Sequence, residues 1–109
     1  MIRIALAALL LSSATVAAAK DSKEEYCGQT ANLVGAIQQA RLDRVPERKV
    51  PETILAANPS WPERYNNAIP LLVPWVYERK MREVRKNDLA AAWKEVCIAN
   101  WDVFKDQLQ

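Results

Sequence analysis

The fold of this chain is decided by the stretch SKEEYCGQTANLVGAIQQARLD, residues 22–43. Ser22, followed three residues later by Glu25, makes the S-x-x-E pattern that caps the start of a helix. Beyond this cap, buried-type residues recur at the spacing of one helical face: Tyr26, Cys27, Thr30, Leu33, Val34, Ile37 and Ala40. The stretch therefore predicts an amphipathic helix that ends near Asp43.

The C-terminal part of the chain predicts a second long helix. Asn87-Asp88 is a suitable cap for a helix over residues 89–107. One side of this helix would carry six apolar residues: Leu89, Trp93, Val96, Cys97, Phe104 and Leu108. Cys27 and Cys97 thus each lie on the apolar face of a predicted helix.

Cys27 and Cys97 are the only cysteines, and in an oxidising compartment such a pair is most simply a disulfide. The alternatives are two free thiols or a metal-binding pair. The chain has no histidine and no CxxC spacing, so we expect neither a zinc site nor a thioredoxin-like motif, and no metal or other cofactor. We predict a bond that joins the first helix to the last.

Prolines divide the region between these two helices. Val-Pro pairs at 45–46 and 50–51 interrupt helical geometry, and a short helix over 51–57 ends at Asn58-Pro59. Ser60 and Glu63 form a second S-x-x-E pattern, which predicts another helix start. A break near Pro70 would precede a helix whose first turn holds Pro74 and which continues to Lys86. The predicted class is all-α: a small disulfide-pinned bundle with three main helices and one or two short ones.

The start of the chain has the features of a secretory signal peptide. Arg3 precedes an apolar run over residues 4–11, and the small residues Ala17-Ala18-Ala19 close the segment. The run falls short of the roughly 20 residues that a spanning helix needs. We expect cleavage after Ala19, which leaves residues 20–109 as a single helical domain, periplasmic or secreted and not membrane-spanning.

Charge and residue content exclude several classes of function. Arg3 is the only charged residue of the leader, so the mature chain keeps all but one of 15 basic residues against 13 acidic ones. This near-balance gives no strong positive field that would attract nucleic acid. The export signal also disfavours nucleic acid as a partner. Without histidine there is no Ser-His-Asp or Cys-His arrangement, and the carboxylates sit among basic residues on predicted surfaces. We expect no catalytic residue and no enzyme.

Two glycines and two polar residues on the predicted helices call for an interpretation. Gly28 and Gly35 are seven residues apart on one side of the first helix, where a neighbouring helix can approach closely; a homodimer seam is the alternative. Arg41 and Asn100 fall within apolar arcs. Arg41 either reaches water at the helix end or joins a polar cluster, and we expect Asn100 to bond a backbone carbonyl.

The surface most suited to a partner lies on the helix predicted after Pro70. The side opposite its apolar face collects Leu71, Trp75, Arg79, Arg82 and Lys86. Arginine beside an aromatic ring is typical of interface hot spots. The alternative is that the segment 45–62 folds over Trp75 and the basic residues are merely solvated. Trp61 and Tyr65 form a second candidate patch, for which core cover is the alternative.

These features favour a small exported helical protein that binds another envelope protein as an accessory or inhibitor-type module. An acid-activated envelope chaperone is the alternative, because protonation of the carboxylates would leave a large positive charge. As a class, the chain resembles the periplasmic immunity proteins of type VI secretion systems, which are also small, helical and often disulfide-bonded. That resemblance implies no site residues here. A carboxylate-based wall hydrolase is a further alternative.

Overall fold

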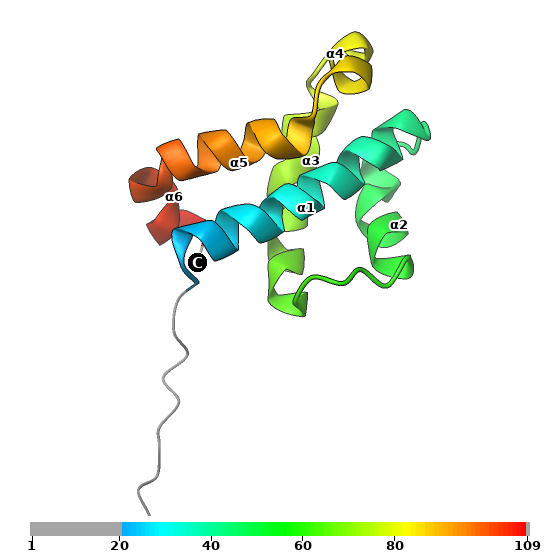
Figure 1. Cartoon of the computed structure of the whole chain (residues 1–109). Helices are drawn as coiled ribbons and strands as arrows, with labels where there is room; N and C mark the ends of the chain where they lie inside the picture. Colours follow the sequence, from blue (N-terminus) through cyan, green and yellow to red (C-terminus); the bar gives the residue numbers. More distant parts are fainter. Residues whose placement is uncertain (1–20, 109) are drawn as a thin grey trace, which may run out of the picture.

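The computed structural model describes residues 21–108, and over this range the regular structure is entirely helical, as predicted. Figure 1 shows α1 (Lys23–Leu42) beside α5 (Leu89–Ala99), with α3 (Ile69–Tyr77) crossing behind them. α1 also contacts α2 (Val50–Ala56) and α4 (Met81–Lys86), so it is the central element. The other elements are α6 (Trp101–Leu108) and two 3-10 helices, η1 (Glu47–Lys49) and η2 (Glu63–Ala68). The predicted signal peptide, residues 1–19, lies outside the described residues.

α1 forms as its sequence predicts. The Ser22 hydroxyl accepts a hydrogen bond from the Glu25 backbone N–H at 3.1 Å, and every residue of the predicted stripe is buried. One polar member of that stripe, Thr30, is satisfied twice: its hydroxyl donates to the Tyr26 carbonyl at 2.8 Å and accepts from Trp93 Nε1 at 2.8 Å. The Thr30 hydroxyl is therefore buried in the core with hydrogen-bond partners for both its donor and its acceptor function.

The predicted disulfide joins α1 to α5. Cys27 and Cys97 are both completely buried, and their Cα atoms lie 5.6 Å apart. The two helices approach closely at Gly35, where a Cβ atom would lie 3.8 Å from the Cβ of Ala90. At Gly28 a Cβ would meet no described atom within 4 Å. Only Gly35 thus lies at an internal helix contact.

The prediction that a helix starts at the Ser60 cap is wrong. The helical segment begins at Glu63, is a 3-10 helix, and has no side-chain cap. Pro62 directly before it is extended, with φ −57° and ψ 139°, and that conformation lies outside a helix. Glu63 is consequently the first helical residue, whereas a capping box needs it at the third position.

The helix predicted to run through Pro74 to Lys86 is two helices. α3 begins at Ile69 and carries Pro74 in its interior, at the cost of one backbone hydrogen bond. Burial of Leu72, Val73 and Val76 offsets that cost. The chain then leaves the helix after Tyr77, and Lys80 is extended (φ −65°, ψ 142°) before α4 begins.

The last predicted helix is also interrupted. Asp88 caps α5 through the Ala91 N–H at 3.0 Å, as expected, but α5 ends at Ala99. Asn100 is the junction: its side-chain amide donates to the Val96 carbonyl, and its own carbonyl accepts from the first turn of α6. This agrees with the expected carbonyl bond, but both Asn100 and Val96 are exposed, which corrects their placement on the apolar face.

Candidate functional site

Trp75 packs at one end of a row of aromatic side chains that continues into the last two helices. Its ring meets the Trp93 ring edge-on, with centroids 5.5 Å apart, and Trp93 in turn stacks with Phe104 at 6.1 Å. Trp93 is buried, whereas Trp75 and Phe104 are half-buried. The neighbour that the structure gives Trp75 is thus α5, where the sequence had suggested the segment 45–62. A ring held in this way is rigid.

Arg79 lies over the ring of Trp75, the outermost member of this aromatic row. Its guanidinium carbon is 4.1 Å from the centroid of the Trp75 ring. The Nε atom is buried and has no acceptor among the described residues, and Arg79 forms no ion pair there. The positive charge is therefore fixed in position by stacking and not by a carboxylate.

Leu71 extends the same surface by one helical turn. It precedes Trp75 by four residues on α3, so the two share one side of that helix. Its side chain is 58% exposed, one of the most exposed large apolar side chains among the described residues. The combination of an exposed aliphatic group, a supported indole and a stacked arginine is typical of a binding surface.

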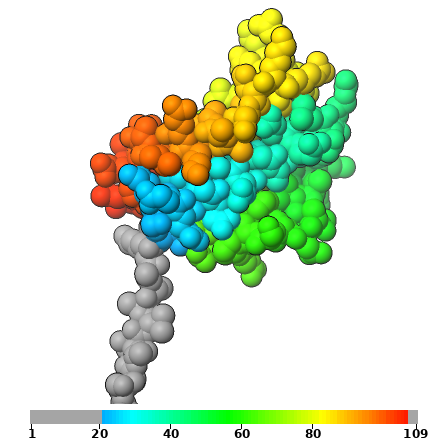
Figure 2. Space-filling view, viewed as in Figure 1, coloured from blue at the N-terminus to red at the C-terminus, as the bar shows by residue number. Residues whose placement is uncertain are grey.

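α4 places a group of basic residues beyond Arg79. Exposed cationic side chains occur at Lys80, Arg82, Arg85 and Lys86, with only Glu83 opposing them within the helix. Figure 2 shows α4 projecting from the body of the molecule. We call the surface formed by Leu71, Trp75, Arg79, Arg82 and Lys86 the α3–α4 corner. The sequence placed these residues on one helix, whereas the structure places Leu71 and Trp75 on α3, Arg82 and Lys86 on α4, and Arg79 in the turn between the two helices.

The projecting α4 is held by its buried Val84 and by hydrogen bonds from one side chain that the sequence analysis did not single out. Gln38 on α1 donates from Nε2 to the Val84 carbonyl at 2.6 Å and to the Asn87 carbonyl at 2.8 Å. Its Oε1 accepts from the Leu89 N–H at 3.3 Å. No local pattern identifies this residue, because its partners lie more than forty positions away in the sequence.

No protein-family model, curated protein or solved structure matches this chain. No helix within residues 21–108 is long and apolar enough to cross a membrane. The same residues contain no group of three or more side chains with metal-ligand chemistry.

Trp61, the remaining residue of the predicted binding surface, lies away from the α3–α4 corner. It lines a cleft of about 390 Å³ between α1, α2 and the connection to η2, and its Nε1 donates to Asn66 Oδ1 at 2.8 Å. Tyr65, which the sequence grouped with it, is 2% exposed and part of the core. The structure thus separates the proposed aromatic patch into a cleft wall and a core residue.

Two further arginines stack on tyrosines, Arg41 on Tyr77 and Arg64 on Tyr65. The Arg41 guanidinium carbon lies 4.9 Å from the Tyr77 ring centroid, and the Tyr77 hydroxyl donates to the Val45 carbonyl at 2.6 Å. Burial raises the pKa of Tyr77. Arg41 Nε is buried without an acceptor among the described residues, and Arg41 lies against an aromatic ring. The polar cluster that the sequence left open as an alternative is therefore not formed among the described residues.

A compact ionic cluster ties the start of α1 to η2. Asp21 accepts hydrogen bonds from Arg64 Nη2 at 2.7 Å and from the Tyr65 hydroxyl at 2.7 Å. The Arg64 hydrogen bond holds the pKa of Asp21 below its usual value, and burial, with the bond to Asp21, raises the pKa of Tyr65 to about 12. These groups are satisfied by one another, so the cluster is structural.

Proposed function

We propose that the protein is an exported binding module that docks a partner protein of the cell envelope at the α3–α4 corner. Export is supported by the leader-like residues 1–19 and by a buried disulfide, since such bonds persist in oxidising compartments. The partner surface would present an apolar group to Leu71 and carboxylates to Arg79 and α4.

The stacking of Arg79 on Trp75 is the observation that carries this proposal. Binding a long, flexible side chain costs conformational entropy, and a side chain already held against a rigid ring loses less. The indole itself is held by Trp93, so the anchor is ordered before the partner arrives. The exposed charges of α4 would add orientation and rate of association more than affinity.

The test is a crosslinking pull-down from native envelopes with the tagged, oxidised protein. The informative variant is Leu71→Asp with Arg82→Glu, because both side chains are exposed and neither supports the core. A matched control is Val103→Asp with Arg48→Glu, which makes the same changes of chemistry and charge at exposed positions on α6 and η1. Trp75 is left intact because it packs on Trp93.

We expect one envelope protein to be recovered by the wild type and the control and lost by the corner variant, with circular dichroism unchanged. A toxin among the recovered proteins would make the chain an immunity protein. Equal recovery by both variants, or no specific protein recovered by the wild type, would contradict the proposal.

A second candidate is an acid-activated chaperone, and the Asp21 cluster is the observation that favours it. Protonation of Asp21 removes the acceptor for Arg64 and Tyr65 and loosens the start of α1 from η2. Apolar surface next to Tyr65 would then open. Tryptophan emission and dye binding that stay constant from neutral pH to about pH 2 would rule this function out.

A further inference from the structure

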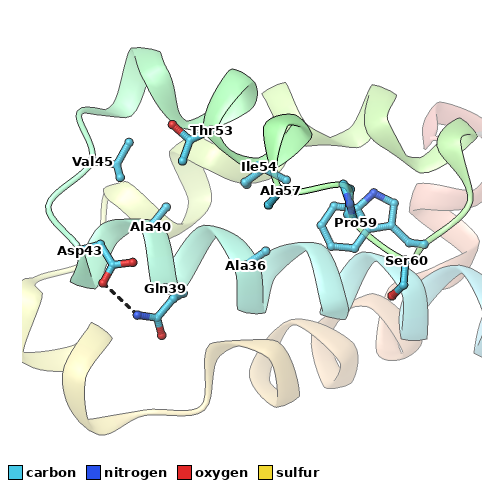
Figure 3. A pocket seen from close by; sticks show the side chains of 11 residues that line it. Ala36, Gln39, Ala40, Asp43, Val45, Thr53, Ile54, Ala57, Pro59 and Ser60 are labelled. Carbon is cyan, nitrogen blue, oxygen red and sulfur yellow. Dashed lines mark hydrogen bonds between the residues drawn. The ribbon is translucent and has the colours of Figure 1, made fainter.

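The cleft between α1 and α2 is a second concave site, distinct from the α3–α4 corner. Its base is one side of α1, formed by Ala36, Gln39, Ala40 and Asp43 at positions i, i+3, i+4 and i+7. Because two of these residues are alanines, their short side chains leave space between α1 and α2. Figure 3 shows Thr53 and Ile54 of α2, and Ala57 directly after it, opposite this base. The lining residues along α1 span about 10 Å, at 1.5 Å of rise per residue.

The walls of the cleft are mostly apolar. Val45, Ile54, Pro59 and Trp61 line it, together with three alanines. Thr53 is polar, but its hydroxyl already donates to the Lys49 carbonyl at 2.8 Å. The volume of about 390 Å³ lies within the range typical of small-molecule sites. Most of a bound ligand's surface would therefore be hydrocarbon.

A carboxylate lies at one end of the cleft. Asp43 is the only charged residue in its lining, and it caps the C-terminus of α1. A carboxylate at this end of a helix is disfavoured by the helix dipole, which is itself negative there. Asp43 accepts a hydrogen bond from Gln39 Nε2 at 3.0 Å but forms no ion pair with a described residue. A cation at this position would interact favourably with both the carboxylate and the helix end.

A helix ends on each side of the cleft. Arg44 (φ 62°) and Asn58 (φ 50°) are the non-glycine residues with left-handed backbone within the described range. Arg44 lies between the lining residues Asp43 and Val45, and Asn58 lies between Ala57 and Pro59. Both residues directly follow a helix end, where left-handed backbone is common. The Arg44 N–H donates to the Arg41 carbonyl and the Val45 N–H donates to the Ala40 carbonyl, which closes the last turn of α1.

We infer that this cleft binds a small amphipathic amine, with its apolar chain or ring along Ala36 and Ala40 and its ammonium group at Asp43. The inference is independent of the α3–α4 corner. The apolar walls select the hydrocarbon part, and the carboxylate at the helix terminus selects the positive head.

The test compares octylammonium, octanol and octanoate, which share one alkyl chain and differ in the charge of the head. Each is titrated into the oxidised protein and followed by amide chemical shifts. We expect shifts confined to residues 36–45 and 53–61, with octylammonium bound about fivefold more tightly than octanol and octanoate bound most weakly.

Two variants and one control separate the contributions of the head and the chain. Asp43→Asn should remove the preference for the ammonium head and retain octanol binding. Ala57→Leu, at an exposed lining position, should weaken all three ligands by filling the cleft. Asp106→Asn, at an exposed carboxylate on α6, should change nothing. Equal affinities for octylammonium and octanoate, or shifts outside the cleft, would overturn the inference.

Discussion

Replacing Gln38 by methionine should weaken the attachment of α4 to the body of the protein and lower the free energy of unfolding. The substitution keeps side-chain length and helix propensity but removes three hydrogen bonds, to the Val84 and Asn87 carbonyls and from the Leu89 N–H. Each such bond contributes about 0.5–1.5 kcal/mol net. The bond from Leu89 is long at 3.3 Å and the Asn87 carbonyl is accessible to water, so we expect a total loss of about 2 kcal/mol.

Urea unfolding measures this loss directly. With a slope of about 1–1.5 kcal/mol per molar urea, the midpoint should fall by about 1.5 M. Hydrogen exchange gives a local readout, because the Leu89 amide loses its acceptor on Gln38 and should exchange faster. The matched control is Gln39→Met, since the neighbouring glutamine bonds only the exposed Asp43. If the two variants lose equal stability and leave the Leu89 amide equally protected, Gln38 does not anchor α4.

The remaining predictions concern the core and the start of α1. Cys27→Ser with Cys97→Ser should lower stability by about 4 kcal/mol, because the bond closes a loop across a sequence separation of 70, and reductant should have the same effect on the wild-type thermal midpoint. Thr30→Val should cost about 1–3 kcal/mol in urea unfolding, because it leaves the buried Trp93 N–H without an acceptor; a loss below 0.5 kcal/mol, about the scatter of surface changes, would refute this. The pKa of Asp21 is lower in the folded state, chiefly through the Arg64 hydrogen bond, so its contribution is present above about pH 4 and lost as pH falls through the lowered pKa. Asp21→Asn should therefore reduce the loss of stability between pH 7 and pH 3, and an unchanged pH dependence would show that other carboxylates dominate.

Helix caps and the buried face of α1 could be predicted because they depend on neighbours within one or two turns. Ser22 and Asp88 both cap as expected, and the disulfide followed from the apolar faces on which Cys27 and Cys97 lie. The pattern at Ser60 failed because the same local signal was overridden by the extended conformation of Pro62. A proline within the cap can therefore override the local signal, although Pro51 in the first turn of α2 does not prevent that helix.

The α3–α4 corner could be predicted only in part. Leu71, Trp75 and Arg79 follow helical spacing in the sequence, and the structure places Arg79 against the Trp75 ring. The support of Trp75 by Trp93 could not be predicted, because pairing between distant helices leaves no trace in the periodicity of either. The same holds for Gln38 and for the cleft, whose volume arises where small residues on α1 face α2.

The disulfide also determines how the protein matures. Cys97 is made only after α1 to α4 have been synthesised, so the thiol of Cys27 waits for its partner through most of the chain. The sequence contains no third cysteine, and only one intramolecular pairing exists. Oxidation therefore needs an electron acceptor but no isomerase, and the bond closes when α5 reaches α1.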